Sequence, residues 1–214
     1  PVGRVSFEWM RPMTFYEFLN ALDFPFLAKK IPQVFDDDPV PVSLAIHNRL
    51  IEQLKRYLIT GGMPEAVERF RQTGSLVQST TVHEEIFQSY LQSLVKYNQR
   101  ADVDSLDQLM RSLPRHVGSQ IKYTRVAPDQ RIEKTKASLD ILEKALIVQT
   151  VTAAGAAGLP LNAHVSTKKI KPLFLDVGLM QYVCGIDPAE ILADTDLSLI
   201  YRGALAEQLV GQEL

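Results

Sequence analysis

The stretch that decides the fold, from Asp129 to Leu179, reads DQRIEKTKASLDILEKALIVQTVTAAGAAGLPLNAHVSTKKIKPLFLDVGL. Its first part predicts a helix that Asp129 caps, because an aspartate can accept hydrogen bonds from the free N–H groups of the first turn. The apolar residues of this helix recur at helical spacing: Ile132, Leu139, Leu142, Ala145 and Leu146.

A β-hairpin is predicted directly after this helix. The β-branched run 147–151 has the length of one strand, and the glycines at 155 and 158 let the backbone reverse. We expect Leu161 to Val165 to pair back as the second strand, and Pro172 to Asp176 to form a further short apolar strand. A helix-turn followed by a helix and a hairpin is the plan of a winged helix, so we predict a winged-helix domain over residues 101–185.

Composition and charge limit the class of protein. A chain of 214 residues with 46% hydrophobic content can bury a core in one domain or in two small ones. The net charge of −2 gives no overall attraction to nucleic acid, so any such attraction must be local. The single cysteine excludes an internal disulfide and fits a reducing compartment. Without a signal peptide or an apolar run near 20 residues, we expect a cytoplasmic protein that does not enter the membrane.

The N-terminal part predicts a short strand, a short helix and a linker. Arg4 to Met10 alternates between polar and apolar residues, as a half-buried strand does. Thr14 and Glu17 have the spacing of a capping box, which predicts a helix to about Leu22. Four prolines forbid a continuous helix in 23–42 and favour a linker.

The middle of the chain is predicted to be nearly all helical. Helices are expected from Ser43 to about Thr60, over residues 64–72 and 76–97, and after Asp102 or Asp104. We therefore assign a helical domain to 43–100. The fold class is mainly α, a helical linker domain followed by a winged-helix module. The chain begins without a methionine and its last predicted helix has no stop signal, so we expect it to be part of a longer polypeptide.

Basic residues cluster on the predicted helix and beside the predicted wing, and they are candidates for contacts with nucleic-acid phosphates. They are Arg131, Lys134 and Lys136 on the helix and Lys168 and Lys169 beside the wing. The alternatives are a solvated helix face and a surface that packs against protein.

The sequence contains no recognised motif for metal binding, phosphate binding or catalysis. The four histidines are far apart and stand beside no cysteine pair, so no metal site is predicted. The turn Gly61-Gly62-Met63-Pro64 lacks the lysine and hydroxyl residue of a phosphate-binding loop and is interpreted as a helix–helix turn. We predict no catalytic residue in this chain.

Four blocks of the sequence resemble AAA-type P-loop ATP-binding proteins of bacteria and archaea. Pro1–Val5 with Pro12–Leu19 is similar to the end of the ATPase core, and Tyr57–Val67 is similar to the linker helices that follow it. Phe174–Leu179 and Arg202–Glu207 resemble the C-terminal domain of unknown function of these proteins. The blocks agree in order and spacing over nearly the whole chain.

The resemblance implies an ATPase core that ends within 1–22, a winged helix in the middle, and the start of a restriction-endonuclease-like domain in 186–214. It implies that Arg4 senses the nucleotide and that Glu207 matches an acid of the nuclease-like first helix. The P-loop lysine and the Walker B acid are missing here, so ATP and Mg²⁺ are expected only for the intact protein.

We therefore expect the non-catalytic coupling portion of an AAA-type ATPase, which links an upstream ATP-binding core to a partner. DNA, another protein and a second copy of the chain are the candidate partners. The alternative is an autonomous winged-helix DNA-binding regulator. A nuclease would require an Asp and a Glu-x-Lys strand after Leu214.

Overall fold

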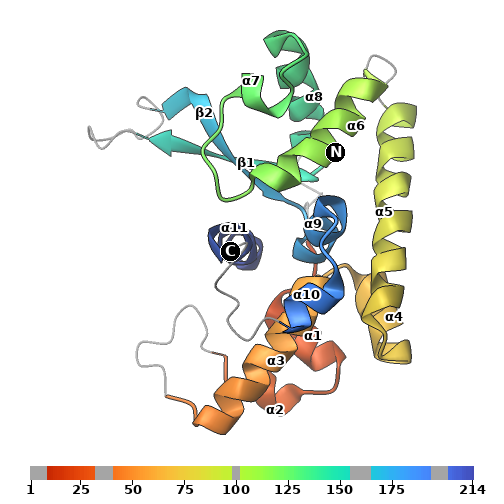
Figure 1. Cartoon of the computed structure of the whole chain (residues 1–214), viewed down its shortest axis with the longest axis vertical. Helices are drawn as coiled ribbons and strands as arrows, with labels where there is room; N and C mark the ends of the chain where they lie inside the picture. Colours follow the sequence, from red (N-terminus) through yellow and green to blue (C-terminus); the bar gives the residue numbers. More distant parts are fainter. Residues whose placement is uncertain (1–8, 32–40, 98–101, 155–164, 194–201) are drawn as a thin grey trace, which may run out of the picture.

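The computed structural model of the chain describes residues 9–31, 41–97, 102–154, 165–193 and 202–214. It is mainly helical, as predicted (Figure 1). Its α-helices are α1 (Phe15–Ala21), α2 (Pro25–Ala28), α3 (Leu44–Thr60), α4 (Pro64–Thr73), α5 (Leu76–Tyr97), α6 (Val103–Ser112), α7 (Tyr123–Val126), α8 (Ile132–Lys144), α9 (Val177–Cys184), α10 (Pro188–Ala193) and α11 (Arg202–Glu213). A 3₁₀ helix, η1 (Leu113–His116), follows α6, and the strands are β1 (Val148–Ala154) and β2 (Val165–Phe174). In the described part, no helix combines the length and apolarity needed to cross a bilayer.

Helices α1 to α4 form one end of the molecule (Figure 1). The predicted capping box is confirmed, since the Thr14 hydroxyl accepts the Glu17 N–H at 3.3 Å and the Glu17 carboxylate accepts the Thr14 N–H at 2.8 Å. The segment predicted as a linker contains α2, whose Leu27 and Ala28 are buried. Pro25 occupies the first turn of α2, where a missing N–H costs nothing, so this proline starts a helix. Residues 32–40 lie outside the description.

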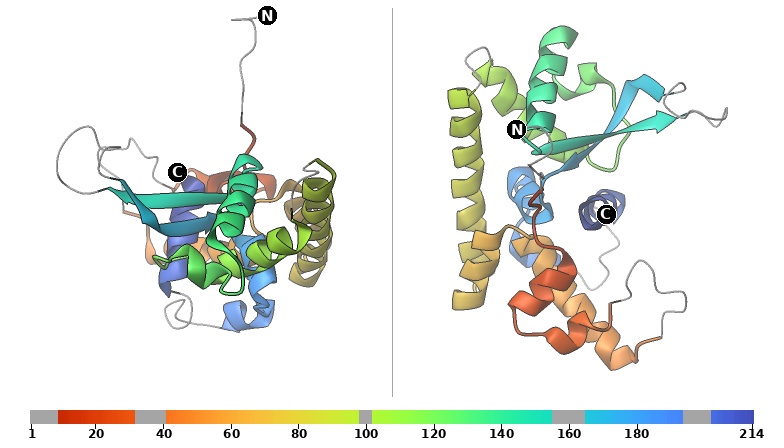
Figure 2. Two further views of the ribbon diagram at one scale, coloured as in Figure 1. Left: turned by 90° about the horizontal axis from the view of Figure 1, so that it is seen from above. Right: turned by 180° about the vertical axis from the view of Figure 1, so that it is seen from behind.

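Helix α5 runs along one side of the molecule and joins its two ends (Figure 2). Its bounds are those predicted from the sequence. The side chains of Phe87 and Leu94 are buried in the same apolar cluster as α6, α8 and the hairpin. The segments on either side of residue 100 therefore share one core.

The hairpin β1–β2 is antiparallel, but its second strand lies later in the sequence than predicted. Val148 pairs with Phe174 and Thr152 pairs with Ile170, with an irregularity between Thr152 and Ala154. The strand therefore spans 165–174, where we had expected Leu161 to Val165; residues 155–164 lie outside the description. The physical reason is burial, because Ile170 and Phe174 are 2% and 4% exposed and fill the core beneath the hairpin.

Helices α6, α7 and α8 pack against this hairpin. Helix α8 begins at Ile132, with Arg131 as its N-cap, and not beside Asp129 as predicted. Asp102 caps α6 by accepting the Ser105 N–H at 2.9 Å. The sequence predicted a helix start after either Asp102 or Asp104, and the first of these is correct. Ile121, between η1 and α7, forms an isolated antiparallel bridge with Ile170 of β2. We call α6, η1, α7, α8, β1 and β2 the helix–hairpin unit.

Helices α9 and α11 lie at the centre, between the two ends of the molecule (Figure 1). A helix at the end of the chain was predicted, and α11 confirms it over residues 202–213. Its apolar side chains are divided: Leu205 and Leu209 are partly buried against the core clusters, whereas Val210 is 56% exposed and Leu214, just after the helix, is 91% exposed.

Candidate functional site

Four segments that are far apart in the sequence meet at one buried place, which we call the polar junction. They are residues 13–15, 57–62, 174–179 and 208–213. They belong to the start of α1, the end of α3, the turn from β2 into α9, and α11. Hydrogen bonds join them, so the junction is the place where both ends of the molecule and α11 are held together.

Asp176 is the central residue of the polar junction and is fully buried. Its Oδ1 accepts the Leu179 N–H at 2.8 Å, which caps α9, and its Oδ2 accepts the Gly62 N–H at 2.6 Å. Burial raises the pKa of the Asp176 carboxyl, while neighbouring His83 and these two hydrogen bonds oppose that rise. One side chain thus satisfies the backbone of two elements and ties α9 to the end of α3.

Glycine is required where α3 and α9 approach each other. Gly61 has φ +69°, and a Cβ there would lie 2.1 Å from Asp176 Oδ1. A Cβ on Gly178 would lie 2.6 Å from the backbone nitrogen of Gly61. The contact is therefore made by backbone against backbone, at a distance that no other residue allows.

His83 holds α5 to the same place. The side chain is 1% exposed, and its Nε2 lies 2.9 Å from the carbonyl oxygen of Thr60. Because a carbonyl oxygen only accepts, Nε2 carries the hydrogen. Burial lowers the pKa of His83, although Asp176 acts in the opposite direction. His83 is one of the four histidines for which the sequence predicted no metal site, and the structure places it beside the central carboxyl.

Helix α11 turns glutamines toward the junction. Gln208 is fully buried; its Oε1 accepts the Phe174 N–H at 2.8 Å and its Nε2 donates to the Phe174 carbonyl at 2.6 Å. One turn later, Gln212 accepts the Val177 N–H at 2.9 Å and donates to the Tyr57 hydroxyl at 2.8 Å. The two glutamines therefore bind the backbone on both sides of Asp176.

The N-terminal segment is joined to the junction by Tyr57 and Glu213. The Tyr57 hydroxyl donates to the Met13 carbonyl at 2.6 Å, and Glu213 Oε1 accepts the Phe15 N–H at 2.7 Å. Burial raises the pKa of Tyr57 well above its usual range, and the charges of Asp176 and Glu213 add to this. Burial also raises the pKa of the Glu213 carboxyl. Residues 13–15 are thus bonded to both α3 and α11.

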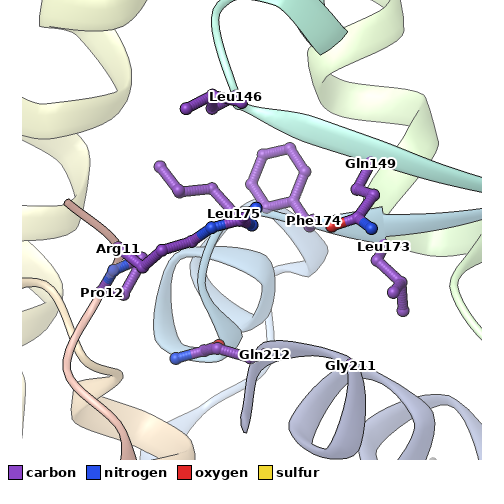
Figure 3. Close-up of a pocket in the computed structure, with 9 residues that line it drawn as sticks. All are labelled: Arg11, Pro12, Leu146, Gln149, Leu173, Phe174, Leu175, Gly211 and Gln212. Carbon is purple, nitrogen blue, oxygen red and sulfur yellow. The ribbon is translucent and has the colours of Figure 1, made fainter. Parts of the chain in front are cut away.

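The space beside the junction is too small for a substrate. Figure 3 shows this pocket, with Leu146 across from Gln212 and with Arg11 and Pro12 along one side. Its volume is about 20 Å³, which is room for about one water molecule. The arrangement can hold elements together and transmit their displacement.

The three basic residues predicted on the helix all lie at the surface of the helix–hairpin unit. Arg131 is exposed at the N-cap of α8. The Lys134 ammonium pairs with Asp102 at 2.5 Å, and Lys136 lies over the ring of Tyr123, 5.1 Å from its centroid. Among the described residues, Arg131 is the one of the three with no ion pair or ring contact.

Of the remaining predicted site residues, Glu207 is the one whose side chain lies in the described part of the chain. Lys168 and Lys169 belong to strand β2, and their side chains lie outside the described part, as does all of Arg4. Glu207 on α11 pairs with Lys171 of β2 at 2.6 Å. Within the described residues, no three His, Cys, Asp or Glu side chains come together as a metal site.

The residues of the polar junction were not predicted from the sequence. One local signal was available: Asp176 stands directly after an apolar strand and before an apolar helix, which is the pattern of an N-cap. Gln208 and Gln212 gave no signal, because a glutamine on a helix is normally solvated.

Comparison with known proteins places the chain in a family. Residues 51–190 match the family described as Domain of unknown function (DUF8612), and the chain belongs to this family. The matched range includes α9 and most of α3. It also includes four residues of the junction: Tyr57, Gly62, His83 and Asp176. The comparisons with curated proteins and with solved structures find no match.

Proposed function

We propose that this member of the DUF8612 family is a coupling module without a reaction centre of its own. It passes a change at the N-terminal segment, residues 9–22, to the helix–hairpin unit. The polar junction carries this proposal, because it bonds Met13 and Phe15 to α3 and α11, and α11 in turn to the end of β2.

The resemblance to AAA-type proteins supplies the nature of that change. Three of the four blocks that carry the resemblance contribute a residue to the junction, Phe15, Tyr57 and Asp176, and the fourth block directly precedes Gln208 on α11. We propose that residues 1–22 are the end of an ATP-binding core in the intact protein, and that the nucleotide state of this core, with Mg²⁺, displaces the segment 12–19. The chain itself acts as the transmitter.

Hydrogen exchange in two backgrounds tests the coupling. Thr14→Ala removes the cap of α1, worth about 1 kcal/mol. In the otherwise native chain we expect faster exchange at the amides of α1, α9 and β2. In a Gln208→Leu, Gln212→Leu background the effect of Thr14→Ala on β2 should be lost, because the bonds of α11 to Phe174 and Val177 are gone.

A matched control removes a cap outside the junction. Asp102→Ala uncaps α6 at a similar cost, so exchange in α1 should not change. If Thr14→Ala speeds exchange in α1 alone with the junction intact, the coupling role is wrong. A reading frame that begins just before residue 1 would remove the ATPase part of the proposal and favour the autonomous regulator.

A second candidate function is contact with DNA through a winged helix. It is supported by the order of elements in the helix–hairpin unit: α6, the Ile121–Ile170 bridge, α7, α8, and the hairpin β1–β2. In this arrangement α8 would be the recognition helix and the loop between the strands would be the wing.

Salt dependence tests this second candidate. Alanine at Arg131, Lys134 and Lys136 together should weaken duplex binding and lower the slope of log K against log [salt] by about 0.9 for each lost phosphate contact. The control is Arg69→Ala. Arg69 is an exposed residue of α4, which lies at the opposite end of the molecule (Figure 1). Equal affinity of the triple variant and the native chain would exclude α8 as the DNA contact.

A further inference from the structure

A groove of about 400 Å³ lies between α5 and the turn that joins α9 to α10 (Figure 1). One wall is a stripe of α5 that includes Val77, Thr81 and Glu84. This stripe spans eight residues, from 77 to 84, and is therefore about 10 Å long. Tyr182, Ile186 and Asp187 line the opposite wall. The groove has the length of a few residues of an extended peptide.

The walls of this groove offer apolar contact. Val77 is 69% exposed although it is a large apolar side chain. The hydroxyls of Thr80 and Thr81 donate to carbonyls of their own helix, at 3.2 and 3.3 Å, and so leave their methyl groups for a ligand. Ile186 completes an apolar surface that attracts an apolar side chain.

The charges of the groove are of one sign. Glu84 and Asp187 are its two charged lining residues, and neither forms an ion pair within the described part of the chain. Arg111, whose charge acts on Tyr182, is paired with Asp107 at 2.9 Å. Asp187 also accepts the Ala189 N–H at 2.8 Å, which holds its carboxylate at the start of α10.

We infer that this groove docks a basic peptide segment of a partner protein, one that carries a large apolar side chain between lysines or arginines. The apolar side chain lies against Val77 and Ile186, and the flanking cations face Glu84 and Asp187. The complementary charge selects such a segment over a neutral or acidic one. This binding goes beyond the coupling role and does not depend on it.

Fluorescence anisotropy with a labelled peptide, Gly-Lys-Leu-Lys-Leu-Lys-Gly, tests the inference on the full chain. The double variant Glu84→Gln with Asp187→Asn should weaken binding at least about tenfold, and Val77→Ser about threefold. These three side chains are at the surface, and asparagine at 187 still accepts the Ala189 N–H, so the fold is kept.

The matched control is Glu85→Gln, which removes a neighbouring exposed acid that does not line the groove and should change binding less than about twofold. Peptides with serine for leucine, or with glutamate for lysine, should bind at least about tenfold more weakly. The inference is overturned if Glu85→Gln weakens binding as much as the double variant, or if the serine or glutamate peptide binds as tightly as the original.

Discussion

The helix–hairpin unit and the polar junction are neighbouring regions of the molecule. Different interactions stabilise each of them. In the unit, Leu106, Leu142 and Ile170 are at most 2% exposed and pack in one apolar cluster. At the junction, α11 turns Gln208 inward and Val210 outward. Apolar packing depends on volume and tolerates substitution of similar size. A buried hydrogen bond depends on one partner, whose removal strands a donor or an acceptor.

The largest expected effect breaks the junction at its closest approach. Gly61→Ala should cost at least about 4 kcal/mol, because the new Cβ would meet the Asp176 carboxylate at 2.1 Å. Gly74→Ala is the matched control: this glycine also has positive φ, +65°, but no atom lies near its Cβ position, and about 1 kcal/mol is expected. Urea unfolding measures both, and equal losses would show that the close contact is unimportant.

The next effect tests the apolar side of the comparison. Leu142→Ala should cost about 3 kcal/mol, because it leaves a cavity beneath the hairpin, whereas Leu142→Met should cost less than about 1.5 kcal/mol. Thermal and urea unfolding give the values. A methionine variant as unstable as the alanine variant would contradict volume-based packing.

A smaller effect on stability is expected when the hydrogen bonds between α11 and the end of β2 are removed. Gln208→Leu keeps much of the volume but strands the N–H and carbonyl of Phe174, at a cost of about 2 kcal/mol. We expect exchange of the α11 amides to rise more than exchange in α8. The control is Gln72→Leu, at an exposed position of α4, which should leave the free energy of unfolding nearly unchanged. Unchanged protection of α11 would mean that apolar contacts hold this helix.

The smallest effect is a pH dependence. Burial raises the pKa of Glu213 in the folded chain, so the unfolded chain loses this proton first as the pH rises. The contribution of Glu213 to stability therefore decreases as the pH rises from about 4.3, the ordinary pKa of glutamate, to the raised pKa. Glu213→Gln keeps an acceptor for the Phe15 N–H and should remove this decline. Unfolding free energies across that window measure it; a variant with the same decline as the native chain would contradict the assignment.

Features with local causes were predictable from the sequence. The capping box at Thr14 and Glu17, the cap at Asp102 and the bounds of α5 follow from hydrogen bonds and periodicity within a few residues. The existence of a hairpin after α8 was also correct. The position of its second strand was not, because that register depends on which residues fill the distant core.

The facing of α11 could not be predicted for a related reason. Periodicity assumes that apolar residues face inward, but α11 lies against the buried backbone N–H groups of Phe174 and Val177, which need polar partners. Lys134 shows the same limit on a single residue, since Asp102, its partner, lies 32 residues earlier in the sequence.

By itself, the amino-acid sequence determined the longer helices, the caps at Thr14 and Asp102 and the presence of a hairpin, because neighbours along the chain control these features. Only the tertiary structure decided that Asp176, Gln208, Gln212 and Tyr57 form one network, since a buried hydrogen bond joins whichever groups the packing brings within 3 Å of each other. Local pattern fixes which elements form, and burial fixes which of their polar groups must find one another.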